Sequence, residues 1–138
     1  MQVYYSNMLT TYLPLVDYGV DLIALVDNQF RKIQVKTGKI KQDGGYWITF
    51  YKDALDKIKG PDAFFIIVLE EVLEEHADYL IVPSMDLSEH IDRGNIKVDK
   101  NDCCHLYFYK QGNSLTHWPT NNTSIDFSKY LNNWAILR

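Results

Sequence analysis

The stretch YGVDLIALVDNQFRKIQVKTG, residues 18–38, contains two apolar runs on either side of a short polar segment. Apolar runs joined by turn-forming residues are typical of a β-hairpin. The first run carries one acid near its start, Asp21, and the second carries Gln34 and Lys36 near its end. The stretch therefore predicts a hairpin in which three polar side chains interrupt two otherwise apolar strands.

The position of the turn decides where those three side chains lie. A two-residue turn at Asn28-Gln29 places Asp21 opposite Lys36, with Gln34 on the same face of the hairpin. Directly opposed residues of an antiparallel pair share a face, so we expect the three groups to gather near the open end. A slip of one residue would bring Val35 opposite Asp21 and disperse the cluster.

Two interpretations of the cluster stay open from the residues alone. The first is a cross-strand pair of Asp21 and Lys36 on a sheet, with Gln34 as a polar neighbour. The second is a site for a hard cation such as Mg²⁺, which binds a carboxylate and further oxygen ligands. In that case the metal stabilises charge on a phosphate, and Lys36 positions the attacking water.

The residues GVDLIAL, a turn and then IQVKTG resemble the core of the PD-(D/E)XK nuclease superfamily. The similarity is greatest to its small resolvase-like and intron-endonuclease-like branches. Their motif is an acid on one core strand and an acid-x-Lys on the next. Asp21 matches the first acid, and Gln34-Val35-Lys36 matches the second part with Gln in place of the acid. The runs DAFFIIVL, ADYLIVPSMDL and YLNNWAIL are similar to later elements of the family.

The resemblance implies a restriction-endonuclease-like fold and an endonuclease that hydrolyses phosphodiester bonds of nucleic acid, with DNA as the expected substrate. Asp21, the Gln34 side-chain oxygen and the Val35 carbonyl would bind Mg²⁺ or Mn²⁺, and Lys36 would act on the attacking water. Related nucleases often dimerise to cut two strands, so a homodimer is a further expectation. The alternative is a degenerate member of the fold, a nucleic-acid-binding or protein-interaction subunit of a regulatory, antitoxin-like kind.

The metal site departs from the family in its acids. Many members carry a Glu on the first helix, whereas no Glu precedes Glu70 in this sequence. Asp17, four residues before Asp21, is an acid that could take its place. Without such help Asp21 is the only carboxylate, and affinity for hard cations depends on the charge of the ligands. An active nuclease and a degenerate member therefore both stay open.

Hydrophobic periodicity predicts a single domain, residues 1–138, of α/β or α+β class, with a mixed central sheet flanked by helices. Helices are expected over residues 3–13, 53–59, 84–91 and 126–137, the first of them short and the third capped by Ser84. Strands are expected over residues 20–26, 31–37, 46–51, 63–69, 79–83 and 106–109, the first three forming a meander.

The composition fits one folded domain. Of the 138 residues, 46% are hydrophobic and 14% aromatic, which is enough to form a core. A net charge of −4 argues against a protein held to nucleic acid by bulk charge. No apolar run reaches the ~18 residues that a membrane span needs, and the first residues lack the pattern of a secretion signal. We therefore expect a cytoplasmic protein without a membrane partner.

Basic residues are concentrated in the second half of the hairpin and just after it, with no acid between residues 28 and 42. A basic strand pair followed by an aromatic side chain that can stack on a base suits a phosphate backbone. The candidates for nucleic-acid contacts are Arg31, Lys32, Lys39, Lys41 and Trp47. An ordinary solvated hairpin with aromatic core residues is the alternative.

The remaining notable residues are expected to have structural roles. Cys103 and Cys104 are adjacent and indicate neither a disulfide framework nor a CxxC metal site. The four histidines lack zinc-ligand spacing such as HxH, so each is expected at the surface or in the core. Asp62, which follows Pro61, is expected in a turn, and the acidic block over residues 70–78 in a solvated segment.

Overall fold

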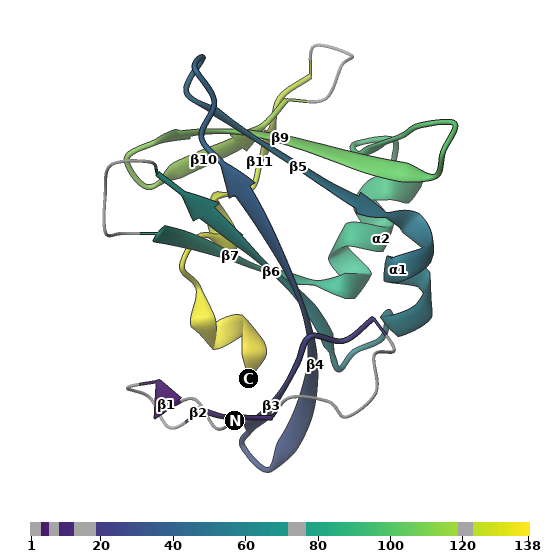
Figure 1. Ribbon diagram of the computed structural model, residues 1–138, viewed down its shortest axis with the longest axis vertical. Helices are drawn as coiled ribbons and strands as arrows, with labels where there is room; N and C mark the ends of the chain where they lie inside the picture. The colour runs from purple at the N-terminus through teal and green to yellow at the C-terminus, as the bar shows by residue number, and fades with distance from the viewer. Residues whose placement is uncertain (1–3, 6–8, 13–18, 72–76, 119–122) are drawn as a thin grey trace.

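The computed structural model describes residues 4–5, 9–12, 19–71, 77–118 and 123–138. These residues form two β-sheets that pack against each other, with helices α1 and α2 at one side of the pair (Figure 1). The arrangement confirms the expected α+β class with a mixed central sheet. The flanking layers differ from the expectation, because a second sheet covers much of one face.

Sheet A has the strand order β1-β2-β3-β4-β6-β7. Its strands are β1 (Tyr4–Tyr5), β2 (Leu9–Tyr12), β3 (Leu22–Val26), β4 (Gln29–Lys39), β6 (Ala63–Glu70) and β7 (Ala77–Pro83). Neighbouring strands are antiparallel except β4 and β6, which are parallel. Strand β4 therefore lies at the centre of the sheet, between its hairpin partner and a parallel neighbour.

Sheet B has the order β11-β10-β9-β5, and β8 also pairs with β9. Its strands are β5 (Gly45–Tyr51), β8 (Lys97–Val98), β9 (Cys103–Gln111), β10 (Ser114–His117) and β11 (Ile125–Asp126). Each of these described pairs is antiparallel. The sheet buries one face and exposes the other, as antiparallel sheets commonly do.

The predicted three-strand meander is wrong at its third strand. Strand β5 follows β4 in the chain but pairs with β9 in the other sheet. The parallel neighbours β4 and β6 need a long crossover connection, and β5 together with helix α1 (Lys52–Ile58) supplies it. Along β5 the buried residues Tyr46, Ile48 and Phe50 alternate with exposed ones, which fits a one-sided sheet.

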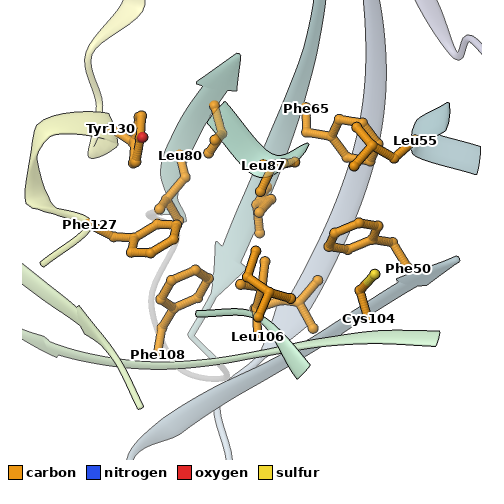
Figure 2. Packing of buried hydrophobic residues seen from close by; sticks show 14 of the residues in the cluster. Phe50, Leu55, Phe65, Leu80, Leu87, Cys104, Leu106, Phe108, Phe127 and Tyr130 are labelled. Carbon is orange, nitrogen blue, oxygen red and sulfur yellow. The ribbon is translucent and has the colours of Figure 1, made fainter. Parts of the chain in front are cut away.

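The main core lies between the two sheets and the two helices. Figure 2 shows Phe50 and Leu106 of sheet B in the same cluster as Phe65 of sheet A and Leu87 of helix α2 (Ser84–Asp92). The rings of Phe50 and Phe65 have centroids 5.4 Å apart. Each apolar side chain buried this fully stabilises the fold by about 1.5–3 kcal/mol, so this cluster joins the two sheets.

A second, smaller core covers the opposite face of sheet A. It consists of Ala24, Val26, Ile33, Phe64, Ile66, Ile81 and Leu137. Its outer side includes the short 3₁₀ helix η2 (Trp134–Leu137), whose Leu137 carbonyl accepts a 2.8 Å hydrogen bond from Arg31 Nε. Strand β6 is buried on both faces as a result, which explains why the run AFFIIVL is uniformly apolar.

Two predicted helices are wrong. Described residues within 3–13 form β1 and β2, and the β-branched and aromatic residues of β2 pair with β3. Residues 126–137 form the end of β11, the 3₁₀ helix η1 (Ser128–Tyr130) and η2. There the Asn132 N–H donates to the Tyr79 carbonyl at 2.6 Å, and Asn132 has a positive φ of 51°. Hydrogen bonds to the edge of β7 thus replace those of a helix.

The other expected elements are confirmed, with small shifts at their ends. Helix α1 replaces the expected 53–59, and α2 the expected 84–91. Ser84 does not cap α2, because its Oγ instead accepts the Gly60 N–H at 3.1 Å and donates to the Gly60 carbonyl at 3.0 Å. The predicted strands correspond to β3, β4, β5, β6, β7 and β9.

Candidate functional site

The hairpin of β3 and β4 closes with a two-residue turn, one residue earlier than predicted. Asp27 and Asn28 occupy it with φ of 49° and 62°, as a type I′ turn requires. Asn and Asp adopt positive φ more readily than other residues with a side chain, which explains the shift from Asn28-Gln29. The last pair of the ladder is Leu22 with Ile33.

The predicted pairing of Asp21 with Lys36 is therefore wrong, and Asp21 lies beside Gln34 instead. Its N–H donates to the Ile33 carbonyl at 2.9 Å, so its backbone bonds to the partner of Leu22 and leaves the register of the ladder, as a bulged residue does. The side chain of Asp21 still reaches Gln34, because the two side chains are joined by a hydrogen bond. The polar cluster is kept, but the acid lies beside Gln34, so Lys36 is two residues further along β4 from the acid than expected.

One oxygen of Asp21 holds this cluster together. Asp21 Oδ2 accepts a 2.6 Å hydrogen bond from Gln34 Nε2 and a 2.7 Å hydrogen bond from the Val35 N–H. The side-chain oxygen of Asp21 thus serves as the partner of Val35 where β3 has not yet begun. Neither bond uses Oδ1. The Val35 carbonyl lies on the same edge of β4 as its N–H, because a strand residue directs both groups to one side.

Gln34 and Lys36 lie two residues apart on one face of β4, about 6.6–7 Å along the strand. Gln34 is only 7% exposed, whereas Asp21 is exposed and Lys36 half-buried. None of the ion pairs within the part of the chain that the structure describes includes Lys36. The site therefore combines one carboxylate, one amide and one cation without an ion-pair partner, at the edge of a buried layer.

On the face of β4 that carries Gln34 and Lys36, the site is bordered by residues of the main core. Gly38, two residues beyond Lys36, lies against Ile48 of sheet B. Val20 packs against the main core, and Gly19 lies next to Ile58 of α1. The site thus borders the main core on this face, and partial exclusion of water strengthens electrostatic interactions there. Asp17, the acid expected to assist Asp21, lies outside the described residues.

The basic residues predicted to bind nucleic acid do not form one surface. Arg31 is half-buried, donates to the Leu137 carbonyl and lies 6.0 Å from the Phe64 ring centroid, on the face opposite Gln34. Lys32 forms a 3.6 Å ion pair with Asp62, and Lys39 is exposed at the end of β4. Lys41 Nζ lies 4.1 Å from the Trp47 ring centroid, on the exposed face of sheet B.

A second polar cluster was not predicted from the sequence. It consists of Asp99, Cys103 and His105, whose potential ligand atoms all lie within 4.8 Å of one another. Cys103 and His105 are two residues apart in β9 and so share a face. Only the turn before β9 brings Asp99 to them, and its sequence separation from them fits no familiar metal motif. The sequence signal that could have indicated this cluster was the Cys-x-His spacing of Cys103 and His105 within a strand.

Comparison of the chain with models of protein families, with curated proteins and with solved structures gave no match. Across the described ranges, no helix has the length and apolar character that crossing a membrane requires.

Proposed function

We propose that this chain is a metal-dependent endonuclease of the PD-(D/E)XK type, which hydrolyses phosphodiester bonds of nucleic acid, DNA foremost. The observation that supports this most is the contact of Asp21 Oδ2 with both Gln34 Nε2 and the Val35 N–H. The resemblance demands that the acid of one strand meet the Gln-x-Lys segment of the next. The contact forms even though the turn differs from the expected one.

Three oxygen donors would hold the ion, Mg²⁺ or Mn²⁺: a carboxylate oxygen of Asp21, the amide oxygen of Gln34 and the carbonyl of Val35. Hard cations prefer oxygen ligands of this kind and retain several waters. Gln34 now directs its amide nitrogen to Asp21. The two ends of an amide have nearly the same shape, so rotation of the side-chain amide would present its oxygen.

The metal would supply Lewis acidity and an activated water. Lys36 lies on the same face as Gln34 without an ion pair among the described residues. Its ammonium group would orient the attacking water and stabilise negative charge that develops on the phosphate. The water oxygen forms a bond to phosphorus, the bond from phosphorus to the sugar oxygen breaks, and the departing oxygen takes up a proton.

Metal binding can be tested without knowing the substrate. Mn²⁺ is titrated by calorimetry into the wild type, Asp21→Asn and a matched control, Asp27→Asn. Asn at position 21 keeps an oxygen for the Val35 N–H but removes the charge, so we expect binding at least about tenfold weaker. Asp27 lies in the turn at positive φ, which Asn tolerates, and its replacement should change nothing. Equal binding in all three proteins, or none in the wild type, contradicts the proposed metal site.

Cleavage tests the role of Lys36. Linear and branched DNA are incubated with Mn²⁺ and the wild type, Lys36→Gln or Lys57→Gln. We expect Lys36→Gln to keep its Mn²⁺ affinity but lose cleavage at least about a hundredfold, as a group that acts on the transition state does. Lys57 is an exposed lysine of α1 outside the candidate nucleic-acid contacts, so its replacement is the control. Cleavage that survives in both Lys36→Gln and Asp21→Asn rules out this active site.

A degenerate member of the fold, which binds nucleic acid or a protein without cleaving, is the second candidate. It is favoured by the Gln34–Asp21 hydrogen bond, because a neutral amide occupies the position where the family has an acid. This candidate predicts no Mn²⁺ binding at Asp21 and retention of any DNA affinity in Lys36→Gln.

For either candidate we place the protein in the cytoplasm, where two free cysteines stay reduced. A homodimer would allow cleavage of both strands.

A further inference from the structure

The turn between β8 and β9 fixes the carboxylate of Asp99 with its own backbone. Asp99 Oδ1 accepts hydrogen bonds from the Asn101 N–H at 2.8 Å and the Cys103 N–H at 3.0 Å. Its other oxygen, Oδ2, lies 2.9 Å from His105 Nε2. These bonds lower the pKa of Asp99, that with His105 most of all. Oδ2 is therefore an ionised oxygen held in a fixed direction.

Strand geometry directs Cys103 and His105 to the same side. Residues of a strand alternate between faces, so both lie on the exposed face of sheet B, while Cys104 between them is buried. The side chains of Asp99 and His105 are 30% and 28% exposed. The three potential ligand atoms thus converge at a position that solvent can reach.

The donors define the class of ion that could bind. Sulfur, imidazole nitrogen and carboxylate oxygen together suit Zn²⁺ and similar transition metals, whereas Mg²⁺ and Ca²⁺ prefer oxygen alone. In a tetrahedral zinc site, bond lengths of about 2.0–2.3 Å place ligand atoms about 3.3–3.6 Å apart. The present atoms lie within 4.8 Å of one another. A small contraction around the ion would complete the geometry, and His105 would move slightly away from Asp99.

We propose that Asp99, Cys103 and His105 form a site for one divalent transition-metal ion of the zinc class, with a fourth position open to water. Three protein ligands and an open position are the arrangement of zinc sites that bind a further small molecule. The site lies on sheet B and shares no residue with the Asp21 cluster of sheet A. It also selects a different class of metal, so the two sites can be tested separately.

The hydrogen bond from Trp47 determines which ring nitrogen of His105 carries the proton, and so affects metal binding. The indole N–H can only donate, and it lies 3.2 Å from His105 Nδ1. Nδ1 must then be the acceptor, so the ring proton is on Nε2, the atom that faces Asp99. Binding of a metal at Nε2 requires the proton to move to Nδ1, where it would oppose the indole N–H. Trp47 is 45% exposed and can turn away, but its present position disfavours the ion.

Cobalt(II) is the probe, because a thiolate bound to it gives a charge-transfer band in the near ultraviolet. The reduced protein, freed of metal by a chelator, is titrated with Co²⁺ as wild type, Cys103→Ser, His105→Gln and Asp102→Asn. We expect one equivalent bound and the band in the wild type. Cys103→Ser should lose the band, and His105→Gln should bind at least about tenfold more weakly. Asp102 is an acid of the same turn at positive φ outside the cluster, so Asp102→Asn should match the wild type.

Two further variants make the test specific. Trp47→Phe keeps an aromatic ring but lacks the N–H, and we expect it to bind Co²⁺ several-fold more tightly. Asp21→Asn should keep the band, because the other candidate site has no sulfur ligand. Absence of the band in the wild type, or an equal band in Cys103→Ser, overturns the site. Circular dichroism of each variant confirms that the chain is folded.

Discussion

The carboxylate of Asp21 completes the hairpin where the backbone of β3 does not, with Oδ2 2.7 Å from the nitrogen of Val35. The same oxygen accepts the amide of Gln34 at 2.6 Å. The atom expected to bind a metal therefore also satisfies two donors of the central strand. A variant at this position has to be designed so that the structural and the chemical roles are separated.

Asp21→Ala removes the acceptor of both donors, and we expect a loss of about 1–3 kcal/mol in the free energy of unfolding, as for unsatisfied polar groups. Asp21→Asn retains an acceptor oxygen and should lose less than about 1 kcal/mol. Urea unfolding of both variants measures the difference. If Asn costs as much as Ala, the charge rather than the hydrogen bonds maintains the fold there.

Gly38 of β4 lies so close to sheet B that a side chain does not fit. A Cβ atom at position 38 would lie 2.7 Å from Ile48 Cγ1 and 2.8 Å from Ile48 Cδ1. Ile48 is buried and cannot swing away. Gly38→Ala should therefore destabilise the protein by about 1–3 kcal/mol, as overpacking does, which thermal or urea unfolding will show.

A double-mutant cycle verifies this cause. Ile48→Val removes the Cδ1 atom, so the loss in Gly38→Ala/Ile48→Val should be smaller than the sum of the two single losses. Additive losses would mean that the two positions do not touch. In that case an effect of Gly38→Ala would reflect backbone conformation instead.

His117 gives the fold a pH dependence of known sign. Burial lowers its pKa below the ordinary 6.5. The Tyr107 N–H donates to Nδ1 at 3.0 Å, and Nε2 lies 2.9 Å from the Asn95 carbonyl oxygen. Between the folded and unfolded pKa values the unfolded chain binds more protons, so stability rises with pH. We expect the melting temperature to fall by a few degrees as the pH drops from about 7.5 to 5.5.

The variant His117→Gln should flatten this dependence, because Gln can accept from one backbone group and donate to the other without titrating. His90 is the matched control, since burial, followed by the nearby Lys129, lowers its pKa as well. The variant His90→Gln should flatten the dependence of the melting temperature on pH only in part. An unchanged slope in His117→Gln would show that other groups cause the dependence. Melting curves at several pH values supply the data.

Ser84 links the beginning of α2 to Gly60, two residues after the end of α1. Its Oγ accepts from the Gly60 N–H and donates to the Gly60 carbonyl, in a fully buried position. Ser84→Ala leaves both backbone groups without this partner and should cost about 1–3 kcal/mol. Ser88 of the same helix is only half-buried, so Ser88→Ala provides the control. Similar small losses in both variants, measured by urea unfolding, would contradict a special role of the Ser84 hydroxyl.

The elements that local patterns determine could be predicted from the sequence. The uniformly apolar run of β6 indicated a strand buried on both faces, and β6 is indeed an interior strand, between β4 and β7. The β3–β4 hairpin and both α-helices were also predicted. The partner of β5 was not, because its alternating pattern fits any antiparallel sheet and β9 lies more than fifty residues further along. The helical spacing near the C-terminus was misleading, since the edge of β7 binds that backbone instead.

In the candidate sites, too, the contacts that depend on local patterns could be predicted, and those that depend on the path of the chain could not. The contact of Asp21 with Gln34 could be expected because it depends on one hairpin, and only the turn was displaced by one residue. The residues predicted to contact nucleic acid are dispersed, because residues close in sequence alternate between faces and between two sheets. The Asp99 cluster was missed because its acid comes from a turn, whose path a strand pattern does not specify.

Cys103 and Cys104 follow each other in the chain but lie on opposite sides of sheet B. Burial raises the pKa of Cys104 to about 12, so this thiol stays protonated and out of reach of reagents. A maleimide or iodoacetamide probe therefore meets a single sulfur, that of Cys103, and the native chain can be labelled at one position without mutagenesis. The rate of that labelling also reports occupancy, because an ion bound to the sulfur would shield it.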